Sequence, residues 1–469
     1  MKIKIPFNLT FAGWMLAIIV PCIILYLRPR LGLGLDASAF LAIFAATIVM
    51  WMFSLSDEFI PSIFAIAMLL ILEIAPPSAV LNGFTSEEFF MVMSVFALGA
   101  VLESSGLAQR LILMVLRFTL PVQRFFNFIV VPCGITLTGV LPSANGRVAL
   151  GAPLYTNMIG LIGYAPQSLG AARLASGVFQ GVTLFSGMFL TSKGVNFVVY
   201  GLLPEQVRHE FGWLYWVVAT AVFGLVTLSL YMLLGKFWFR MAPPPKVDRA
   251  GLIREIEARG PMSSKEKAAL AGIAIMLLAF ATTGIHKIAP PWVALSILYI
   301  LLALNFLTKK EFQKNINWPF LIYLGSLTGL CKVMTHVGLD TWIAGHLSFV
   351  IHYMRSDFTL FVLMLFAAIT AVRFMVPNNA TVAIFASILL PMADIGGVNP
   401  WILGWLILTI SDSWFLPYQC TYVMEFREVL GKEGPASMST FLKVNAMTNV
   451  IRLIAILACI PYWKELKIL

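Results

Sequence analysis

The sequence predicts an all-α polytopic membrane protein built from two inverted repeats. Of its 469 residues, 60% are hydrophobic and only 12% are charged, whereas soluble domains carry about 25% charged residues. Apolar runs long enough to cross a hydrocarbon core of about 30 Å recur along the whole chain. Two short polar motifs, at 142–146 and 377–381, interrupt these runs at matching places in the two halves. Uncharged polar groups are costly at membrane depth unless they face protein or water, so the paired motifs also mark the expected functional site.

The distribution of basic residues predicts the orientation of the chain. Lys and Arg gather in the connections at 108–124, 236–267 and 307–317, whereas 76–88 contains neither. Because cytoplasmic connections are enriched in Lys and Arg, we expect the first three segments in the cytoplasm and 76–88 on the opposite side. The net charge of +10 therefore needs no nucleic acid as a partner. We expect an integral protein of the bacterial inner (plasma) membrane, with a cytoplasmic N-terminus.

Composition divides the chain into an N-terminal span, two repeats and a connection between them. The N-terminal span covers 1–37 and the first repeat covers 38–235. A hydrophilic cytoplasmic linker with three consecutive prolines (243–245) follows at 236–267, and the second repeat covers 268–469. Each repeat shows the same order of full spans, an amphipathic stretch, two half-length apolar segments and an interrupted span. If each repeat crosses the membrane an odd number of times, the two repeats have opposite orientations.

Two half-length apolar segments flank each polar motif, over about 125–163 and about 358–397. Each segment is too short to span a bilayer, so each pair predicts a re-entrant hairpin with its motif at the tip. We name residues 142–146 tip 1 and residues 377–381 tip 2. Backbone N–H groups that begin a helix attract anions, and unwound carbonyls attract cations. The tips therefore predict a site for a small anion and a cation; for one motif alone, a helix kink with local hydrogen bonds is the alternative.

The span that follows each hairpin contains a polar break, at 191–196 in the first repeat and at 412–421 in the second. Lys193 is the most informative residue, because a lysine at membrane depth pairs with an acid or a ligand. It is expected either to attract an anionic substrate directly, or to pair with a protein carboxylate or reach the interface. Asp412 is expected to pair with a nearby base or to cap a helix, with a proton relay as the alternative.

Two arginines adjoin the tips. Arg147 directly follows tip 1, and Arg373 precedes tip 2 by four residues. Each is expected either to offset substrate charge or to anchor the chain at the membrane interface. For Arg373 the interfacial position is the preferred expectation.

These residues resemble the divalent anion/sodium symporter family, whose members carry dicarboxylates, citrate or sulfate. That family has Ser-Asn-Thr signatures at two hairpin tips, and Ser-Ala-Asn (143–145) and Asn-Asn-Ala-Thr (378–381) occupy those places here. The stretch VLESSGLAQRL (101–111) and the Leu-Pro-Tyr-Gln run (416–419) are also similar to family sequences. The resemblance extends from about residue 38 to about residue 463.

The resemblance implies about eleven transmembrane helices, two re-entrant hairpins, a homodimer and an elevator-type motion of the site across the bilayer. It also implies a small anionic substrate between the tips and sodium ions beside them, with no other cofactor or metal. The substrate-binding residues would be Ser143, Asn145, Lys193, Asn378, Asn379, Thr381, Gln419 and Thr421. The sodium-binding residues would be Ser143, Asn145, Gly146, Asn378, Asn379 and Ala380.

The departures from the family pattern concern the coupling ion. Tip 1 reads Ser-Ala-Asn before Arg147, tip 2 lacks its serine, and Lys193 stands where many relatives have a small hydroxyl residue. We expect a secondary transporter of small dianions coupled to sodium, and an anion exchanger or proton-coupled permease of the same superfamily is the alternative. A membrane-embedded enzyme would need clustered catalytic residues, and a channel would need a continuous polar pore. The sequence shows neither pattern, so no enzyme activity is expected.

Overall fold

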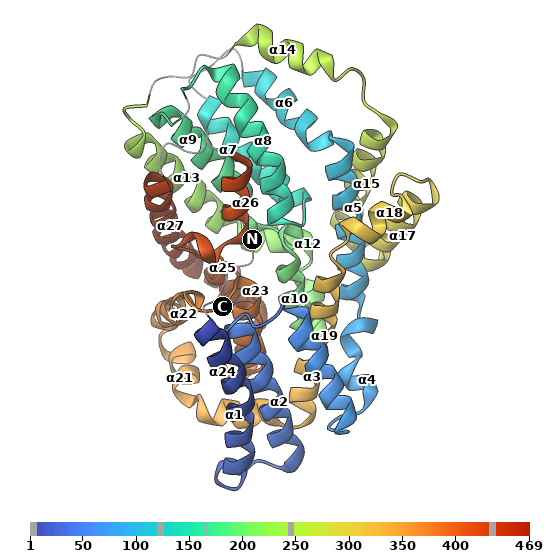
Figure 1. The fold of residues 1–469 in the computed structure, drawn as a ribbon, viewed down its shortest axis with the longest axis vertical. Coiled ribbons are helices and arrows are strands. Elements are labelled where there is room, and N and C mark those ends of the chain that lie inside the picture. Colours follow the sequence, from blue (N-terminus) through green and yellow to red (C-terminus); the bar gives the residue numbers. More distant parts are fainter. Residues whose placement is uncertain (1–6, 120–125, 166, 243–247, 431–437) are drawn as a thin grey trace.

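The computed structural model describes residues 7–119, 126–165, 167–242, 248–430 and 438–469. Parts of the chain with sequence-based predictions lie outside the described residues. They include the prolines at 243–245 and residues 1–6, which the prediction of a cytoplasmic N-terminus concerns. Within the described ranges the chain folds into helices and turns, without a β-strand (Figure 1). The predicted all-α architecture is therefore confirmed.

Six of the described helices are long and apolar enough to cross a membrane. Their spanning parts are Leu9–Leu31 in α1 (Phe7–Leu31), α2 (Leu35–Met52), α5 (Glu87–Ser105), α13 (Ala221–Trp238), Asn378–Gly396 from α23 to α24, and Ser439–Glu465 in α27 (Met438–Glu465). Shorter apolar helices include α3 (Phe59–Ile71) and α17 (Pro290–Ala303). Together with α15 (Ser264–Ala281), α19 (Trp318–His336) and the interrupted spans, these helices form the predicted polytopic fold.

The apolar helices flank each tip where the sequence places them, apart from residue 125, which is not among the described residues. The second helix of each pair is longer than the expected half-length segment, because α8 has 19 residues and the segment Asn378–Gly396 also has 19. In the first repeat, α7 (Phe126–Val140) and α8 (Ala144–Ile162) meet at tip 1. In the second, α22 (Phe358–Arg373) and α23 (Asn378–Leu389) meet at tip 2. At tip 1 the Ser143 hydroxyl accepts a hydrogen bond from the Gly146 amide at 3.1 Å. This bond satisfies one of the free N–H groups at the beginning of α8.

Each interrupted span connects one hairpin to the other. The first consists of α9 (Leu169–Thr183) and α10 (Gly194–Leu202), and the second of α25 (Pro400–Ser411) and α26 (Thr421–Leu430). Residues 184–193 between the first two helices are break 1, and residues 412–420 are break 2. α9 packs against α7 and α8, whereas α10 packs against α23; conversely, α25 packs against α22 and α23, whereas α26 packs against α8. The two spans therefore run in opposite directions between the hairpins (Figure 1).

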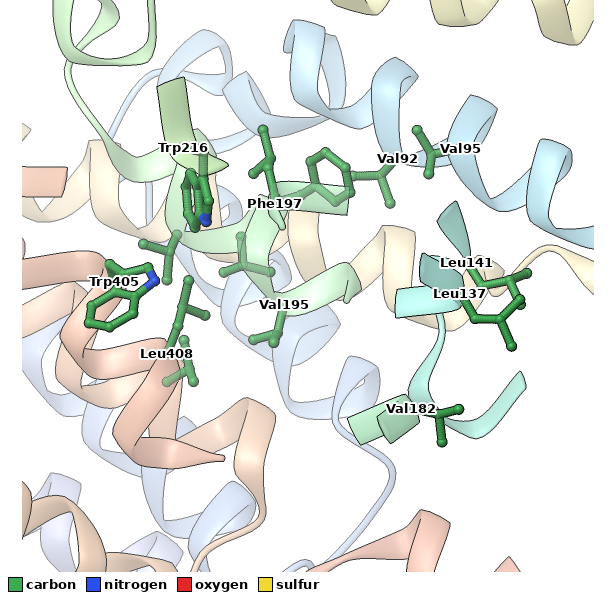
Figure 2. Packing of buried hydrophobic residues seen from close by; sticks show 14 of the residues in the cluster. Val92, Val95, Leu137, Leu141, Val182, Val195, Phe197, Trp216, Trp405 and Leu408 are labelled. Atoms are coloured by element: carbon green, nitrogen blue, oxygen red, sulfur yellow. The ribbon is translucent and has the colours of Figure 1, made fainter. Parts of the chain in front are cut away.

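A buried apolar core fixes break 1 between these helices. Figure 2 shows Phe197 of α10 beside Val92 of α5, with Trp405 of α25 on the other side of α10. The indole N–H groups of Trp405 and Trp216 both donate to the Gly187 carbonyl of break 1, at 2.8 and 3.0 Å. A main-chain carbonyl in the short 3₁₀-helix Ser186–Met188 thus obtains two partners within an apolar core, as a buried acceptor requires.

The linker differs from the expected polar stretch at 236–267. It contains a short helix, α14 (Arg249–Ala258), and α15 begins at Ser264 rather than at 268. The earlier start has a local cause, because Ser263 and Glu266 form a capping box. Glu266 is also buried and forms an ion pair with Arg110 of α6 (Leu107–Thr119), with 2.6 Å between Arg110 Nε and Glu266 Oε1. The end of the linker is therefore fastened to the first repeat.

A second polar link near the linker predicts a pH dependence of stability. The Lys265 ammonium donates to Glu311 of α18 (Lys309–Asn315), which also accepts from the Thr308 amide at 2.9 Å. These bonds, the Lys265 bond first, lower the pKa of Glu311 from 4.5 to about 2. A carboxyl group whose pKa is lowered by folding stabilises the folded state at pH values above its ordinary pKa. This stabilisation is lost as the pH falls toward the lowered pKa.

We therefore expect Glu311→Gln to lower the thermal midpoint at pH 7, and the difference from the wild type to shrink as the pH falls from 4.5 toward about 2. Thermal unfolding in detergent across this range measures the difference. Glu257→Gln, at an exposed position of α14, is the control and should show no such trend. A difference that stays constant down to the lowest pH would contradict the assignment.

Candidate functional site

A buried arginine fastens tip 1 to break 1. Arg147 of α8 is completely buried. Its Nε donates to the Val182 carbonyl at the end of α9 at 2.7 Å. Its Nη1 donates to the carbonyls of Leu141, just before tip 1, and Ser192, at the end of break 1. One guanidinium thus satisfies carbonyls of the hairpin and of both sides of the break.

Arg373 performs the corresponding task in the second repeat. It is 3% exposed, and its guanidinium donates at 2.7 Å to three carbonyls: Ser411 at the end of α25, Val376 just before tip 2, and Gln419 in break 2. The expected interfacial anchor is therefore wrong for Arg373. A cation that bonds three otherwise unpaired carbonyls is stable at a buried position, because it removes the cost of leaving those acceptors unsatisfied.

The two arginines come from opposite arms of their hairpins, since Arg147 follows its tip and Arg373 precedes its tip. Nevertheless they bond carbonyls at corresponding places: before the tip, at the end of the helix before the break, and late in the break. Their donors are engaged with the main chain. Both residues therefore shape the site and add positive charge to it, without a free face for a ligand.

Lys193 forms a buried ion pair with Asp412. Lys193, at the end of break 1, donates to the Asp412 carboxylate, at the start of break 2, and each residue is 8% exposed. The Lys193 ammonium also lies 5.3 Å from the centroid of the Tyr422 ring. Of the alternatives for Lys193, the structure contains the pairing with a protein carboxylate. This pair joins the two interrupted spans at their breaks.

The buried charges around the two breaks are unequal. Four cations, from Arg147, Lys193, Arg373 and Arg452, accompany one buried acid, Asp412, which interacts electrostatically with all four. The net charge of this group, which we call the junction, is therefore +3. Charges within a low-dielectric interior act over longer distances than charges in water. The junction thus generates a positive potential that favours a small anion beside it.

Three residues of the predicted substrate site lie exposed next to the junction. Ser143 and Asn145 of tip 1 and Thr421 at the start of α26 are all accessible. The Thr421 hydroxyl approaches the Asn145 side-chain oxygen at 3.4 Å. This contact joins residues from both repeats. Thr421 also directly precedes Tyr422, whose ring faces Lys193, so the contact marks one accessible corner of the junction. Neutral hydroxyl and amide groups there are able to bind anion oxygens.

Tip 2 has a different environment, because Asn379 bonds to residues of other elements and the side-chain oxygen of Asn378 is buried. The Asn379 side-chain amide donates to the Glu58 carboxylate at 2.9 Å, and the Asn379 main-chain carbonyl accepts from the Tyr323 hydroxyl at 2.9 Å. The side-chain oxygen of Asn378 is buried and lacks a partner among the described residues. An unpaired buried acceptor is a suitable ligand for a cation. Asn378 is therefore the predicted sodium-binding residue whose surroundings fit that role best.

The remaining predicted site residues face the protein interior. The Thr381 hydroxyl donates to the Pro377 carbonyl at 2.9 Å, and Thr381 and Ala380 are completely buried. Gln419 uses its whole side-chain amide within the fold, because its Nε2 donates to the Arg373 carbonyl and its Oε1 accepts from the amides of Phe415 and Leu416. Gly146 is partly exposed at tip 1. Thr381 and Gln419 thus shape tip 2 and break 2 rather than offer free groups to a ligand.

Sequence reasoning missed Arg452, Glu58 and Tyr323. A signal for Arg452 does exist, because polar residues at helical spacing run along one face of α27: Asn445, Thr448, Asn449 and Arg452. All four are at most 5% exposed, and such a stripe in an apolar span indicates a polar neighbour. Glu58 and Tyr323 are brought to tip 2 only by the fold, so their local sequence carries no comparable signal.

An open cavity of about 830 Å³ lies away from the junction. Its walls come from the beginnings of α5 and α17 and from α10, α11 (Glu205–Glu210), α19 and α23. Acidic residues outnumber Lys and Arg in its lining. The acidic residues are Glu87, Glu88, Glu205, Asp340 and Asp394, and the basic ones are Lys332 and Arg208. Arg208 is already paired with Glu88. Size alone would favour this cavity as an anion site, but its charge opposes that role.

Comparison with known proteins agrees with this architecture. Residues 8–469 match the family model described as the sodium:sulfate symporter transmembrane region. The chain is 23% identical over 418 residues to the inner membrane protein YbhI of Escherichia coli K12, covering 86% of the chain and 87% of the relative. It is 24% identical over 283 residues to the L-tartrate/succinate antiporter of the same strain, covering 57% of each protein.

A solved structure supports the fold independently of close sequence similarity. The YdaH transporter of Alcanivorax borkumensis superposes with a TM-score of 0.57 at 13% identity, over 86% of this chain and 90% of that one. At this identity the likeness concerns the fold alone. The family model, in contrast, covers nearly the whole sequence, including both tips and both breaks. The chain is therefore an integral membrane protein and belongs to the family of sodium:sulfate symporter transmembrane regions.

Proposed function

We propose that this protein is a secondary active transporter of small dianions, with dicarboxylates as the first substrate class and sulfate as the second. The observation that carries the proposal is the net charge of +3 at the junction, beside the accessible Asn145 and Thr421. A relative that carries tartrate and succinate supports dicarboxylates. The neutral tip residues fix the orientation of the anion, and the buried cations lower its free energy in the site.

For the transport step we propose an elevator motion of the hairpins together with the interrupted spans. Arg147 and Arg373 bond each hairpin to its own interrupted span, and Lys193 and Asp412 join the two spans. These contacts support movement as one body. As the family resemblance implies, we further propose a homodimer. From the distribution of basic residues we propose a cytoplasmic N-terminus in a bacterial inner membrane.

Two modes of coupling have support. The family description supports symport with sodium, and the unpaired Asn378 oxygen at tip 2 is a group that a sodium ion would satisfy. The name of the L-tartrate/succinate antiporter supports exchange of one dianion for another. Exchange is also favoured by the junction itself, because its fixed cations already supply charge that bound sodium would otherwise supply. We propose sodium symport as the first mode and anion exchange as the second.

Uptake into proteoliposomes tests both the substrate and the mode. Labelled succinate and labelled sulfate are offered with an inward sodium gradient, with a potassium gradient, and with unlabelled succinate inside the vesicles. Sodium symport requires accumulation that depends on the sodium gradient. Exchange requires uptake that depends on internal succinate and not on sodium. Absence of uptake of either anion under every condition would overturn the proposed function.

A further inference from the structure

Asp412 has a second buried cation beside it. Arg452 of α27 is 5% exposed and interacts electrostatically with Asp412. The Arg452 guanidinium donates through Nη1 to the hydroxyl of Ser413, the residue that follows Asp412, at 3.1 Å. The guanidinium is therefore bonded one residue along the chain from a carboxylate that is already bonded to the ammonium of Lys193.

Arg452 has more unused hydrogen-bonding capacity than the other two arginines of the junction. Arg147 and Arg373 each bond three carbonyls. Arg452 forms one hydrogen bond to a described residue, and its Nε is buried without a partner among them. A guanidinium carries five N–H donors, and a buried donor without an acceptor is unfavourable. This unused capacity is unexpected for a purely structural arginine and suits a group that changes partners.

The backbone around Arg452 is held in place, so a partner change requires only a side-chain movement. Asn445 and Asn449 of α27 both donate to the Trp414 carbonyl of break 2, at 2.5 and 2.7 Å. These two bonds fix the helix against the same break that carries Asp412. The Arg452 side chain is thus bonded to Ser413, the residue beside Asp412, while its Nε lacks a partner among the described residues.

We propose that Arg452 is the reserve partner of Asp412 and takes over its carboxylate when an anionic substrate draws the Lys193 ammonium away. The inference rests on the proposed function, because it requires an anion that reaches Lys193. A buried carboxylate left without a cation is strongly unfavourable, and this cost would oppose substrate binding. When Arg452 pairs with the Asp412 carboxylate and Lys193 pairs with the substrate, each negative charge is still paired with a cation. Arg452 is therefore a positioning residue, which acts through Asp412 and Lys193 without touching the substrate.

A double-mutant cycle tests the partnership without any substrate. Thermal midpoints in detergent are compared for Lys193→Gln, Arg452→Gln, the double variant, and the double variant with Asp412→Asn. We expect each single variant to lower the midpoint by less than about 3 °C, because one cation still serves Asp412. The double variant should lose at least about 5 °C more than the sum of the singles, or fail to fold. Asp412→Asn should then restore most of the loss, because it removes the unpaired charge.

Arg254→Gln replaces Arg452→Gln in the matched control cycle, because Arg254 is exposed on α14 and pairs there with Asp248. Its effect should add to that of Lys193→Gln without coupling. Additive losses in the Arg452 cycle, or no rescue by Asp412→Asn, would overturn the reserve partnership. This result does not depend on whether the protein transports dianions.

A binding measurement then tests the role toward the substrate. We expect Arg452→Gln to raise the succinate Kd about tenfold, whereas Arg452→Lys should stay within about threefold of the wild type, because an ammonium also pairs with Asp412. Equal Kd values for Arg452→Gln and the wild type, or no rescue by lysine, would overturn the positioning role. If the wild type binds neither succinate nor sulfate, the proposed function fails, while the stability cycle still decides whether Arg452 and Lys193 share Asp412.

Discussion

Replacement of Arg147 by lysine is expected to lower the free energy of unfolding by about 3 kcal/mol. Arg147 bonds the carbonyls of Val182, Leu141 and Ser192 from a completely buried position. A lysine keeps the charge, but its single ammonium cannot reach carbonyls that lie on three sides of a planar guanidinium. At least one buried carbonyl is then left without a donor. The hairpin, break 1 and their mutual orientation should all be affected.

Thermal or denaturant unfolding in detergent measures this loss, with Arg254→Lys at an exposed position as the matched control. The control should stay within about 0.5 kcal/mol of the wild type. Arg373→Lys should behave like Arg147→Lys, because Arg373 also bonds three carbonyls. If both lysine variants were as stable as the control, the arginines would not be the contacts that hold the tips to the breaks.

Replacement of Lys193 by glutamine is expected to weaken dianion binding by about 10- to 100-fold. The ammonium faces the ring of Tyr422, which directly follows the accessible Thr421. A hydrogen bond to a charged partner contributes about 1.5–3 kcal/mol in a buried site, which corresponds to this range. A neutral amide retains hydrogen-bonding groups and removes the charge.

Isothermal titration with succinate measures the change in Kd. Lys332→Gln is the matched control, because this exposed lysine lines the 830 Å³ cavity. Its succinate Kd should equal that of the wild type. The reverse pattern, with Lys332→Gln weakened and Lys193→Gln unchanged, would move the anion site from the junction to the cavity.

The hairpins and interrupted spans were predictable because their signals are local. An apolar segment, a polar tip and a second apolar segment follow one another in the sequence, and α7, α8, α22 and α23 lie on either side of the tips accordingly, although the second segments are longer than expected. Lys193 and Asp412 were also recognisable as costly charges in apolar surroundings. Their direct pairing connects positions 219 residues apart, and sequence reasoning left it as one of several alternatives.

Surroundings that depend on main-chain geometry were not predictable from the sequence. Arg373 resembles an interfacial anchor in sequence, yet it is buried because three carbonyls point at one position after folding. Gln419 lies in a run that resembles family sequences. Its side-chain amide forms hydrogen bonds within the fold, with the Arg373 carbonyl and with two main-chain N–H groups of break 2. The directions of main-chain carbonyls in the breaks, which lie outside the α-helices, cannot be predicted from the residue types there. Glu58 likewise meets Asn379 only through the packing of α3, α19 and tip 2.

Binding of a dianion at the junction is tested most directly by an experimental structure with bound succinate. We predict density for one carboxylate within hydrogen-bonding distance of Asn145, Thr421 and the Lys193 ammonium, with Arg452 turned onto Asp412. Density for succinate in the acid-lined cavity beside Glu88 and Asp340, with Lys193 still bonded to Asp412, would contradict the junction as the anion site.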